Sequence, residues 1–253
     1  MSHEFCFSTL ALKPKYRLLA VELAASLETY APGVILFVGT DDPHDFKDCK
    51  NVYPFKFKKR GVFCYHDKRF VLEKALQQFK TAIQIDADTR IIGPLPEVIE
   101  PTPGLAAVHI EKIIGHSEKY NPERLGYFYK LATKLQVDLD AVSYIGEALF
   151  ALSNNGDKTL EFFRQWGFLA DYFELNGIYG GEGNALGLAA AKAGLEILKP
   201  TWLQSVEQIR KHFDASIGSH STAWDNFLNR VDYHYHLNKI RITSLRNIDF
   251  YYR

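Results

Sequence analysis

TAIQIDADTRIIGPLP, residues 81–96, is the stretch that decides the fold expected for this chain. Residues 82–85 (Ala-Ile-Gln-Ile) are mainly apolar and precede turn-forming residues, a pattern typical of a strand that is buried on both faces. Asp86 and Asp88 follow, and they share one side of an extended backbone because strand side chains alternate. Both carboxylates are therefore expected to point beyond the carboxyl edge of an α/β sheet, where such folds bind ligands.

These two carboxylates indicate a site for a metal ion and a diphosphate. Converging carboxylates repel each other unless a cation lies between them. Their hard oxygens suit Mg²⁺ or Mn²⁺, and an ion held by few protein groups completes its coordination shell with water and substrate phosphates. Asp is also a common turn residue, so an alternative stays open in which Asp86 caps a turn and Asp88 is solvated.

The composition indicates a folded protein and argues against several classes. The 253 residues are 47 % hydrophobic and 14 % aromatic, which is enough for a large core. The formal net charge is zero, so no overall field favours nucleic acid, and no such partner is expected. Three cysteines without a Cys-x-x-Cys spacing favour a reducing compartment. With no leader pattern and no long apolar run, we expect a cytoplasmic protein without a membrane span.

The segments before the motif alternate between strand and helix patterns. Residues 4–12 predict a strand, residues 14–30 a helix, and residues 34–38 a second buried strand. A helix over residues 67–79 then leads into the strand before the two acids. With right-handed crossovers, the strands of such a series end at one edge of the sheet. Basic and Phe side chains alternate in residues 55–60, which predicts an edge strand or a basic lip over a phosphate or acceptor.

Two further acidic side chains follow the motif. Residues 142–152 predict a strand, and Glu147 inside it is a costly buried charge unless it is paired or belongs to a site. Residues 176–187 are rich in glycine, which lets the backbone approach a ligand closely. Glu182 lies in that stretch where a helix begins, and the helix dipole stabilises a carboxylate there. Glu182 is therefore a candidate for catalysis, with helix capping as the alternative.

Three other segments are less informative. Residues 111–122 read as a polar loop in which His116 is solvated. Residues 195–200 predict the last strand of the sheet. Residues 229–253 are dense in Tyr and His and predict a final helix that packs on the body, covers the site or mediates self-association.

The order of these motifs resembles that of the nucleotide-sugar glycosyltransferases of the GT-A fold, most nearly the glycogenin-like and galactosyltransferase-like group. The resemblance covers residues 4–155. In that group a helix with a basic residue near its start leads into a strand that ends in Leu-Asp-x-Asp, and the matching segments here are residues 68–74 and 85–89. It implies a single α/β domain with a mixed, mostly parallel sheet flanked by helices. Residues 1–100 are then the nucleotide-binding half and residues 101–253 the acceptor-binding half with the C-terminal tail.

The resemblance also implies roles for donor-binding residues. Asp88 and Asp86 are expected to bind the cation, Mn²⁺ or Mg²⁺, that bridges the two phosphates of the donor. Arg69 is expected to reach the donor near its phosphates or its sugar. Thr9 and Asp41, near the ends of the first two strands, are expected to contact the ribose and the base.

Catalytic residues and a third metal ligand are implied as well. Members of the group present an acidic residue near the position of Glu182, which is the general base in inverting enzymes and binds a sugar in retaining ones. Glu147 stands where the group carries an Asn-x-Gly-type segment, so this chain departs from the pattern there. His220 is implied as a metal ligand, and an imidazole beside two carboxylates favours Mn²⁺ over Ca²⁺. Trp224 follows His220 as in the group, but the Lys-Pro that precedes this Trp is missing.

The sequence therefore predicts a hexosyltransferase that moves a sugar from a nucleoside-diphosphate sugar, UDP-linked by preference, to a hydroxyl acceptor on a glycan, lipid or protein. Two alternatives stay open, and so does the oligomeric state. In a haloacid-dehalogenase-like phosphatase Asp86 is the nucleophile, but that motif follows the first strand, and Arg90 stands here in place of its Thr. The other alternative is a non-catalytic protein that binds sugar nucleotides.

Overall fold

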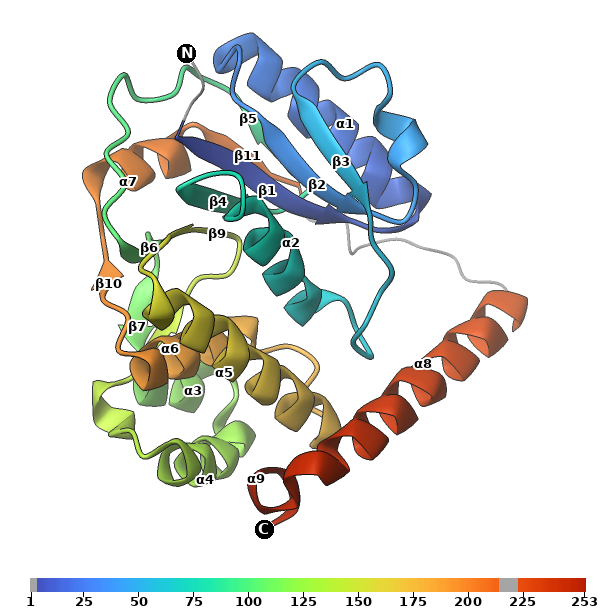
Figure 1. Ribbon diagram of the computed structural model, residues 1–253, viewed down its shortest axis with the longest axis vertical. Helices are drawn as coiled ribbons and strands as arrows, with labels where there is room; N and C mark the ends of the chain where they lie inside the picture. Colours follow the sequence, from blue (N-terminus) through green and yellow to red (C-terminus); the bar gives the residue numbers. More distant parts are fainter. Residues whose placement is uncertain (1–3, 214–222) are drawn as a thin grey trace.

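A seven-stranded sheet with helices on both faces dominates the computed structural model, which describes residues 4–213 and 223–253 (Figure 1). Its strand order is β10-β6-β9-β4-β1-β2-β3. The strands of this sheet are β1 (Phe5–Ala11), β2 (Leu36–Thr40), β3 (Val52–Lys56), β4 (Thr81–Ile85), β6 (Gly104–Ala107), β9 (Leu149–Ser153) and β10 (Ile197–Leu198). Two small antiparallel sheets pair β5 (Thr89–Ile91) with β11 (Arg210–His212), and β7 (Ile110–Lys112) with β8 (Ser143–Ile145).

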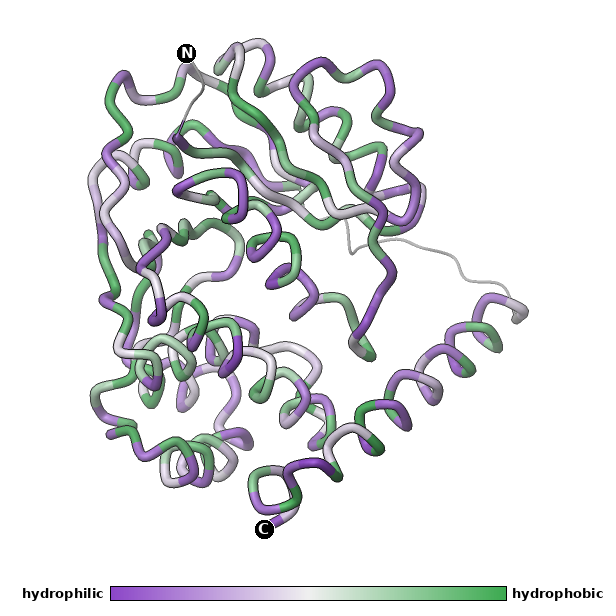
Figure 2. The backbone as a smooth tube through the Cα atoms, in the orientation of Figure 1, coloured by the Kyte–Doolittle hydropathy of each residue, from purple (hydrophilic) through white to green (hydrophobic). Residues whose placement is uncertain are grey.

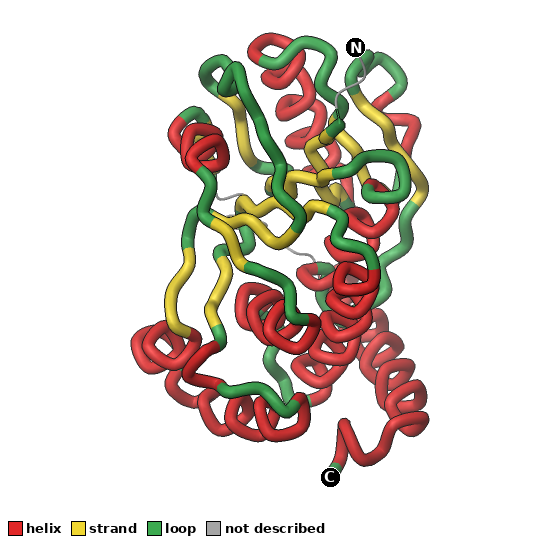
Figure 3. Tube along the Cα trace, turned by 60° about the vertical axis from the view of Figure 1, so that its left-hand side comes forward, coloured by secondary structure: helices red, strands yellow, loops and turns green. Residues whose placement is uncertain are grey.

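The α-helices pack around these strands and continue into the C-terminal part of the chain (Figure 3). They are α1 (Lys13–Tyr30), α2 (Lys68–Ala75), α3 (Ile113–Tyr120), α4 (Leu125–Leu135), α5 (Asp157–Leu175), α6 (Glu182–Ala193), α7 (Thr201–Gln208), α8 (Ala223–Ser244) and α9 (Ile248–Tyr252). Most of the strands and helices expected from sequence patterns are present, with β2 beginning two residues later than predicted.

The central strands are buried on both faces because their side chains alternate between two hydrophobic cores. Phe7 of β1 and Ile83 of β4 belong to the core that α1 and α7 cover. Cys6 and Ala82, their neighbours in sequence, belong to the core that α2, α4, α5 and α6 cover. The apolar run before the two acids therefore forms a strand in the middle of the sheet, as predicted.

The carboxyl ends of β1, β2 and β4 lie at one edge of the sheet. β1 is parallel to both neighbours, with Thr9 opposite Val38 of β2 and Ser8 opposite Gln84 of β4. β9 is antiparallel to β4 and to β6, which makes the sheet mixed but mostly parallel. The sheet type and the common edge agree with the prediction, and β3 is an edge strand that includes residues 55 and 56 of the segment 55–60, whereas residues 57–60 follow it outside any strand.

The prediction of one strand over residues 142–152 is wrong, because the chain breaks into β8 and β9 at residues 146–148. The backbone N–H of Gly146 donates to the carbonyl oxygen of His109 at 2.9 Å. A Cβ at position 146 would lie only 2.9 Å from the Cβ of His109, so the close contact requires glycine. Glu147 consequently lies half-buried in the break and not inside an apolar strand.

The prediction of a polar loop over residues 111–122 is also wrong, because most of this segment forms α3. Ile113 and Ser117 share a buried face one turn apart, and the hydroxyl of Ser117 donates to the carbonyl of Ile113 at 2.6 Å. His116 lies on this helix with its side chain only 12 % exposed, so the expectation that it is solvated is wrong. The many polar residues concealed a short helix with a narrow apolar face.

The C-terminal part of the chain adds a strand and a long helix. β10 is the last strand of the seven-stranded sheet, as predicted for residues 195–200, and β11 follows it in a separate sheet with β5. α8 extends away from the sheet and alternates polar and apolar residues along its length (Figure 2). Leu237 and Ile240 of α8 pack on Val62, which agrees with the predicted packing of a final helix on the body. Within residues 4–213 and 223–253, no helix has the length and apolar character that crossing a bilayer requires.

Candidate metal and catalytic site

Asp86, Asp88 and His212 form a group of potential metal ligands at the carboxyl edge of β4. One ligand atom of each residue lies within 4.8 Å of the others, and Nδ1 of His212 lies 3.6 Å from Oδ1 of Asp88. The side chains are 22 %, 12 % and 39 % exposed, so an ion or a substrate can reach them. Two carboxylates and an imidazole are a donor set that fits Mn²⁺, and the two carboxylates alone fit Mg²⁺.

Backbone pairing of distant segments brings these side chains together. The amide of Thr89 donates to the carbonyl of Asp86 at 3.1 Å, which turns the chain directly after β4. β5 then pairs with β11 so that Thr89 lies opposite His212, and the amide of Phe213 donates to the carbonyl of Asp88 at 2.8 Å. No local pattern marks His212 as a ligand, so this residue was not predicted. His220, the ligand implied by the resemblance, lies outside the described residues.

Lys68, the first residue of α2, connects the metal-ligand group to Glu182. Its Nζ lies 2.7 Å from Oδ1 of Asp86 and 3.3 Å from Oε2 of Glu182. Burial favours the neutral amine, but the two carboxylates outweigh this effect and raise the pKa of Lys68 above its ordinary value. Lys68 therefore places a fixed positive charge beside the two acids.

Glu182 begins α6 and is only 2 % exposed. Burial raises the pKa of Glu182 to about 8; Lys68 opposes this shift, whereas Glu147 and Asp86 add to it. Oε1 of Glu182 and Oδ1 of Asn184 are buried and have no hydrogen-bond partner among the residues that the structure describes. Buried polar atoms without partners are rare in folded proteins, so these two oxygens are candidates for contact with a ligand.

Glycines hold α6 close to β8 and thereby fix the position of Glu182. A Cβ on Gly183 would overlap the carbonyl oxygen of Ile145, and one on Gly187 would overlap the carbonyl oxygen of Ser143. The glycines of this stretch predicted a close approach of the backbone to a ligand. Gly183 instead serves the approach of a helix to a strand, and so does the neighbouring Gly187.

Glu147 lies beside the start of α6. The hydroxyl of Tyr144 donates to Oε2 of Glu147 at 2.7 Å, and burial together with this carboxylate raises the pKa of Tyr144. The same oxygen lies 2.8 Å from where a Cβ on Gly183 would be. The structure thus brings Glu147, Glu182, Lys68 and Asp86 into one cluster, as the charge effects on the Glu182 pKa also indicate.

The structure places the three remaining predicted donor-binding residues in different surroundings. Arg69 is buried against α5, and its neighbour Lys68 makes the contact with Asp86 instead. Asp41 forms an ion pair with Arg17 at 2.8 Å. Thr9 is fully buried in β1, and its hydroxyl has no hydrogen-bond partner within residues 4–213 and 223–253. The donor-binding roles of Arg69, Asp41 and Thr9 stay predictions.

Comparisons with known proteins establish the fold. No protein-family profile and no curated protein sequence matches the chain. A crystal structure of galactosyltransferase LgtC in complex with donor and acceptor sugar analogs is similar over 90 % of this chain and 95 % of that chain, with a TM-score of 0.52 and 10 % sequence identity. This chain has a GT-A fold. The resemblance noted in the sequence is thereby confirmed for the GT-A architecture, and its mixed sheet agrees.

Proposed function

We propose that the protein is a metal-dependent hexosyltransferase that moves a sugar from a nucleoside-diphosphate sugar, UDP-linked by preference, to a hydroxyl acceptor on a glycan, lipid or protein. The observation that carries this proposal is the grouping of Asp86, Asp88 and His212 at the carboxyl edge of a GT-A sheet. Lys68 and the buried Glu182 lie next to that group. The solved galactosyltransferase with donor and acceptor sugar analogs, which has the same fold, supports the choice of substrates.

A divalent cation, Mn²⁺ or Mg²⁺, is proposed to be held by Asp86, Asp88 and His212. When bound, it supplies positive charge to a diphosphate leaving group. Lys68 fixes the Asp86 carboxylate through their 2.7 Å contact and adds a second positive charge that requires no rearrangement during the reaction. Thr9, Asp41 and Arg69 remain the proposed contacts to the nucleoside and the donor sugar.

Glu182 is the proposed catalytic carboxylate. A pKa of about 8 lies close to neutral pH, where a side chain most effectively takes up and releases a proton. In an inverting reaction the ionised form of Glu182 accepts the proton of the acceptor hydroxyl, and in a retaining reaction Glu182 binds a sugar. Glu147, whose carboxylate accepts a hydrogen bond from Tyr144, lies in the neighbouring loop, and its negative charge helps to raise the pKa of Glu182.

Thermal unfolding with UDP, UDP-hexoses and GDP, each with and without Mn²⁺, tests the donor and the metal together. We expect UDP to raise the unfolding temperature only with Mn²⁺, because the proposed cation holds the diphosphate. At about 100 times its Kd, a ligand stabilises a protein by about 2.7 kcal/mol. Slow release of hexose from the matching UDP-hexose is expected under the same conditions.

Two results would contradict this proposal and support a different function. Hydrolysis of an aryl phosphate without any nucleotide supports the phosphatase alternative with Asp86 as nucleophile. Metal-dependent binding of a sugar nucleotide without hydrolysis or transfer, even with pools of acceptors, supports a non-catalytic binding protein.

A further inference from the structure

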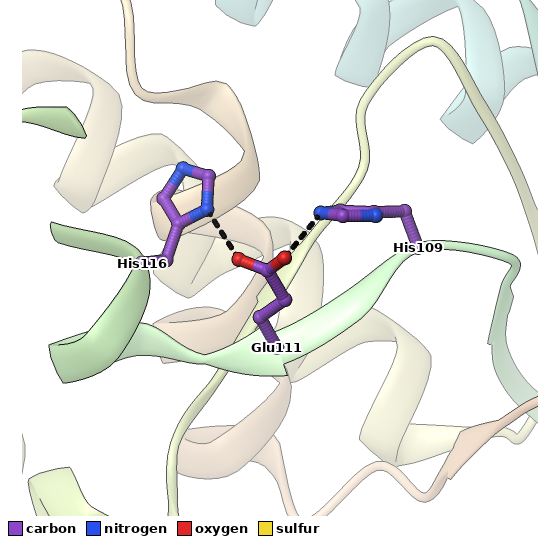
Figure 4. Close-up of side chains that lie close together, drawn as sticks. All are labelled: His109, Glu111 and His116. Carbon is purple, nitrogen blue, oxygen red and sulfur yellow. Dashed lines mark hydrogen bonds and ion pairs between the residues drawn. The ribbon is translucent and has the colours of Figure 1, made fainter. Parts of the chain in front are cut away.

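A second group of potential metal ligands lies on α3 and the segment that leads into it. His109 follows β6, Glu111 lies in β7, and His116 lies in α3 (Figure 4). Nε2 of His109 lies 3.2 Å from Oε1 of Glu111, and Nδ1 of His116 lies 2.9 Å from Oε2 of the same carboxylate. Both imidazoles thus point a ring nitrogen at the same acid from opposite sides, as Figure 4 shows.

Packing holds these three side chains in place. The His116 ring stacks on Tyr144 with the ring centres 3.5 Å apart and the planes 9° from parallel. Glu111 pairs with Tyr144 across the β7–β8 ladder. The backbone of His109 is fixed by the 2.9 Å hydrogen bond from Gly146, where only glycine fits. The β7–β8 ladder, the hydrogen bond to the His109 backbone and the stacking on Tyr144 therefore hold this group together.

The spacing and the chemistry of the group fit a transition-metal ion. One ligand atom of each residue lies within 4.8 Å of the other two, and two tetrahedral ligands at about 2.1 Å from Zn²⁺ lie about 3.4 Å apart. Two imidazoles with one carboxylate are a set that proteins use for Zn²⁺, whereas Mg²⁺ prefers oxygen ligands. Side-chain exposures of 56 % for His109, 36 % for Glu111 and 12 % for His116 leave room for a water or another ligand in a fourth position.

We propose that His109, Glu111 and His116 bind one Zn²⁺ ion at a site distinct from Asp86, Asp88 and His212. No member of this group belongs to the group at the carboxyl edge of β4. This Zn²⁺ site does not rest on the proposed sugar transfer. Bound Zn²⁺ replaces the contacts of both imidazoles with Glu111 and cross-links β7, α3 and His109, which immediately precedes β7.

Calorimetric titration of Zn²⁺ into the metal-free full-length Asp88→Asn protein tests the site, because this background impairs the first metal-ligand group. Variants His109→Ala and His116→Phe are added separately to that background, and Phe retains the stacking on Tyr144 without a ligand nitrogen. We expect each to weaken Zn²⁺ binding at least tenfold. The control is His44→Phe, which changes an exposed histidine outside the group. Co²⁺ in place of Zn²⁺ is expected to give a tetrahedral absorption spectrum that both variants lose.

The proposal holds only if both histidine variants weaken binding and the control does not. If the Asp88→Asn protein binds no Zn²⁺, or if either histidine variant binds it as tightly as the background, the three side chains only hydrogen-bond one another and the proposal is wrong. Glu111→Gln, which keeps the length of the side chain, repeats the test if a histidine variant does not fold. It too must lose at least tenfold in affinity for the proposal to stand.

Discussion

The start of α2 sends consecutive charged side chains into two different regions of the molecule. Lys68 contacts Asp86 and Glu182 at the carboxyl edge of the sheet. In that region the buried Oε1 of Glu182 has no hydrogen-bond partner among the described residues. Arg69 points instead toward α5, and Asp67 points toward the loop that precedes α2.

Two acids of this second region, Asp67 and Glu174, accept hydrogen bonds from backbone amides. Asp67 accepts a hydrogen bond from the amide of Arg60 at 2.8 Å. Glu174 of α5 accepts two, from Val62 at 2.8 Å and from Phe63 at 3.2 Å. These carboxylates therefore tie a loop to the body of the protein, as buried polar groups with complete partners do.

The two regions differ in whether the buried carboxylates have hydrogen-bond partners, and not in the direction of their pKa shifts. Burial raises the pKa of Glu182 to about 8 and that of Glu174 to about 7. Perturbed titration occurs both at functional sites and in structural networks. Of these two glutamates, Glu182 combines the shift with an oxygen that has no hydrogen-bond partner among the described residues and with a nearby group of potential metal ligands, whereas both oxygens of Glu174 accept hydrogen bonds. We therefore infer that Glu182 contacts a substrate and that Glu174 stabilises the folded protein.

The largest expected effect is the loss of turnover on Glu182→Gln. We expect kcat to fall by about 10²–10⁴-fold, because a proton-transferring side chain contributes that much. The free energy of unfolding should stay within about 1 kcal/mol of the wild type, because Gln resembles the protonated Glu that burial favours. Transfer rates and urea denaturation measure the two quantities. Glu118→Gln, on the exposed side of α3, is the matched control. If the transfer rate of Glu182→Gln stays within threefold of wild type, Glu182 is not catalytic and has only a structural role.

Glu174→Ala is expected to show the opposite pattern, with lower stability and normal chemistry. The buried amide of Val62 and the partly buried amide of Phe63 lose their acceptor, and each unsatisfied group costs about 1–3 kcal/mol, so we expect a total loss of about 2–6 kcal/mol. The measurement is urea denaturation, with Glu118→Ala as the control. A loss below about 0.5 kcal/mol would show that these hydrogen bonds do not hold the loop.

A smaller effect is expected in the pH dependence of stability. The folded protein holds a proton on Glu174 more tightly than the unfolded chain, because burial raises the pKa from 4.5 to about 7. This contribution is complete below about pH 4.5 and is lost as the pH rises through about 7, and its size is at most about 3 kcal/mol. Urea denaturation of wild type and Glu174→Gln at several pH values isolates it. We expect the wild type to lose stability relative to the variant between pH 5 and 8; a constant difference would contradict the shift.

Sequence patterns predicted the parts of this molecule that depend on local order. The apolar run before Asp86 forms a central strand, as predicted, because its own apolar side chains favour burial on both faces. The shared edge of β1, β2 and β4 followed from the alternation of strands and helices and from the fixed hand of the crossovers. Glu182 was placed correctly at a helix start because glycines marked the turn before it.

The parts that sequence patterns missed depend on contacts between distant segments. His212 joins Asp88 only through the pairing of β11 with β5, and no periodicity encodes that pairing. Which of Lys68 and Arg69 faces Asp86 depends on how α2 rotates on the sheet, so the contact between Lys68 and Asp86 could not be predicted from local order. The break at Gly146 arises from the backbone of His109, which is remote in sequence.

Binding of UDP to wild type and Asp88→Asn, measured by calorimetry with and without Mn²⁺, tests most directly whether the edge of β4 holds a cation for a sugar nucleotide. For wild type we predict that Mn²⁺ tightens UDP binding at least tenfold. For Asp88→Asn we predict the loss of this gain, because even groups outside the first coordination shell contribute about 10–100-fold to metal affinity. Asp48→Asn, at an exposed position, should behave as wild type. An Asp88→Asn protein that keeps the full Mn²⁺-dependent gain would contradict the assignment of the site.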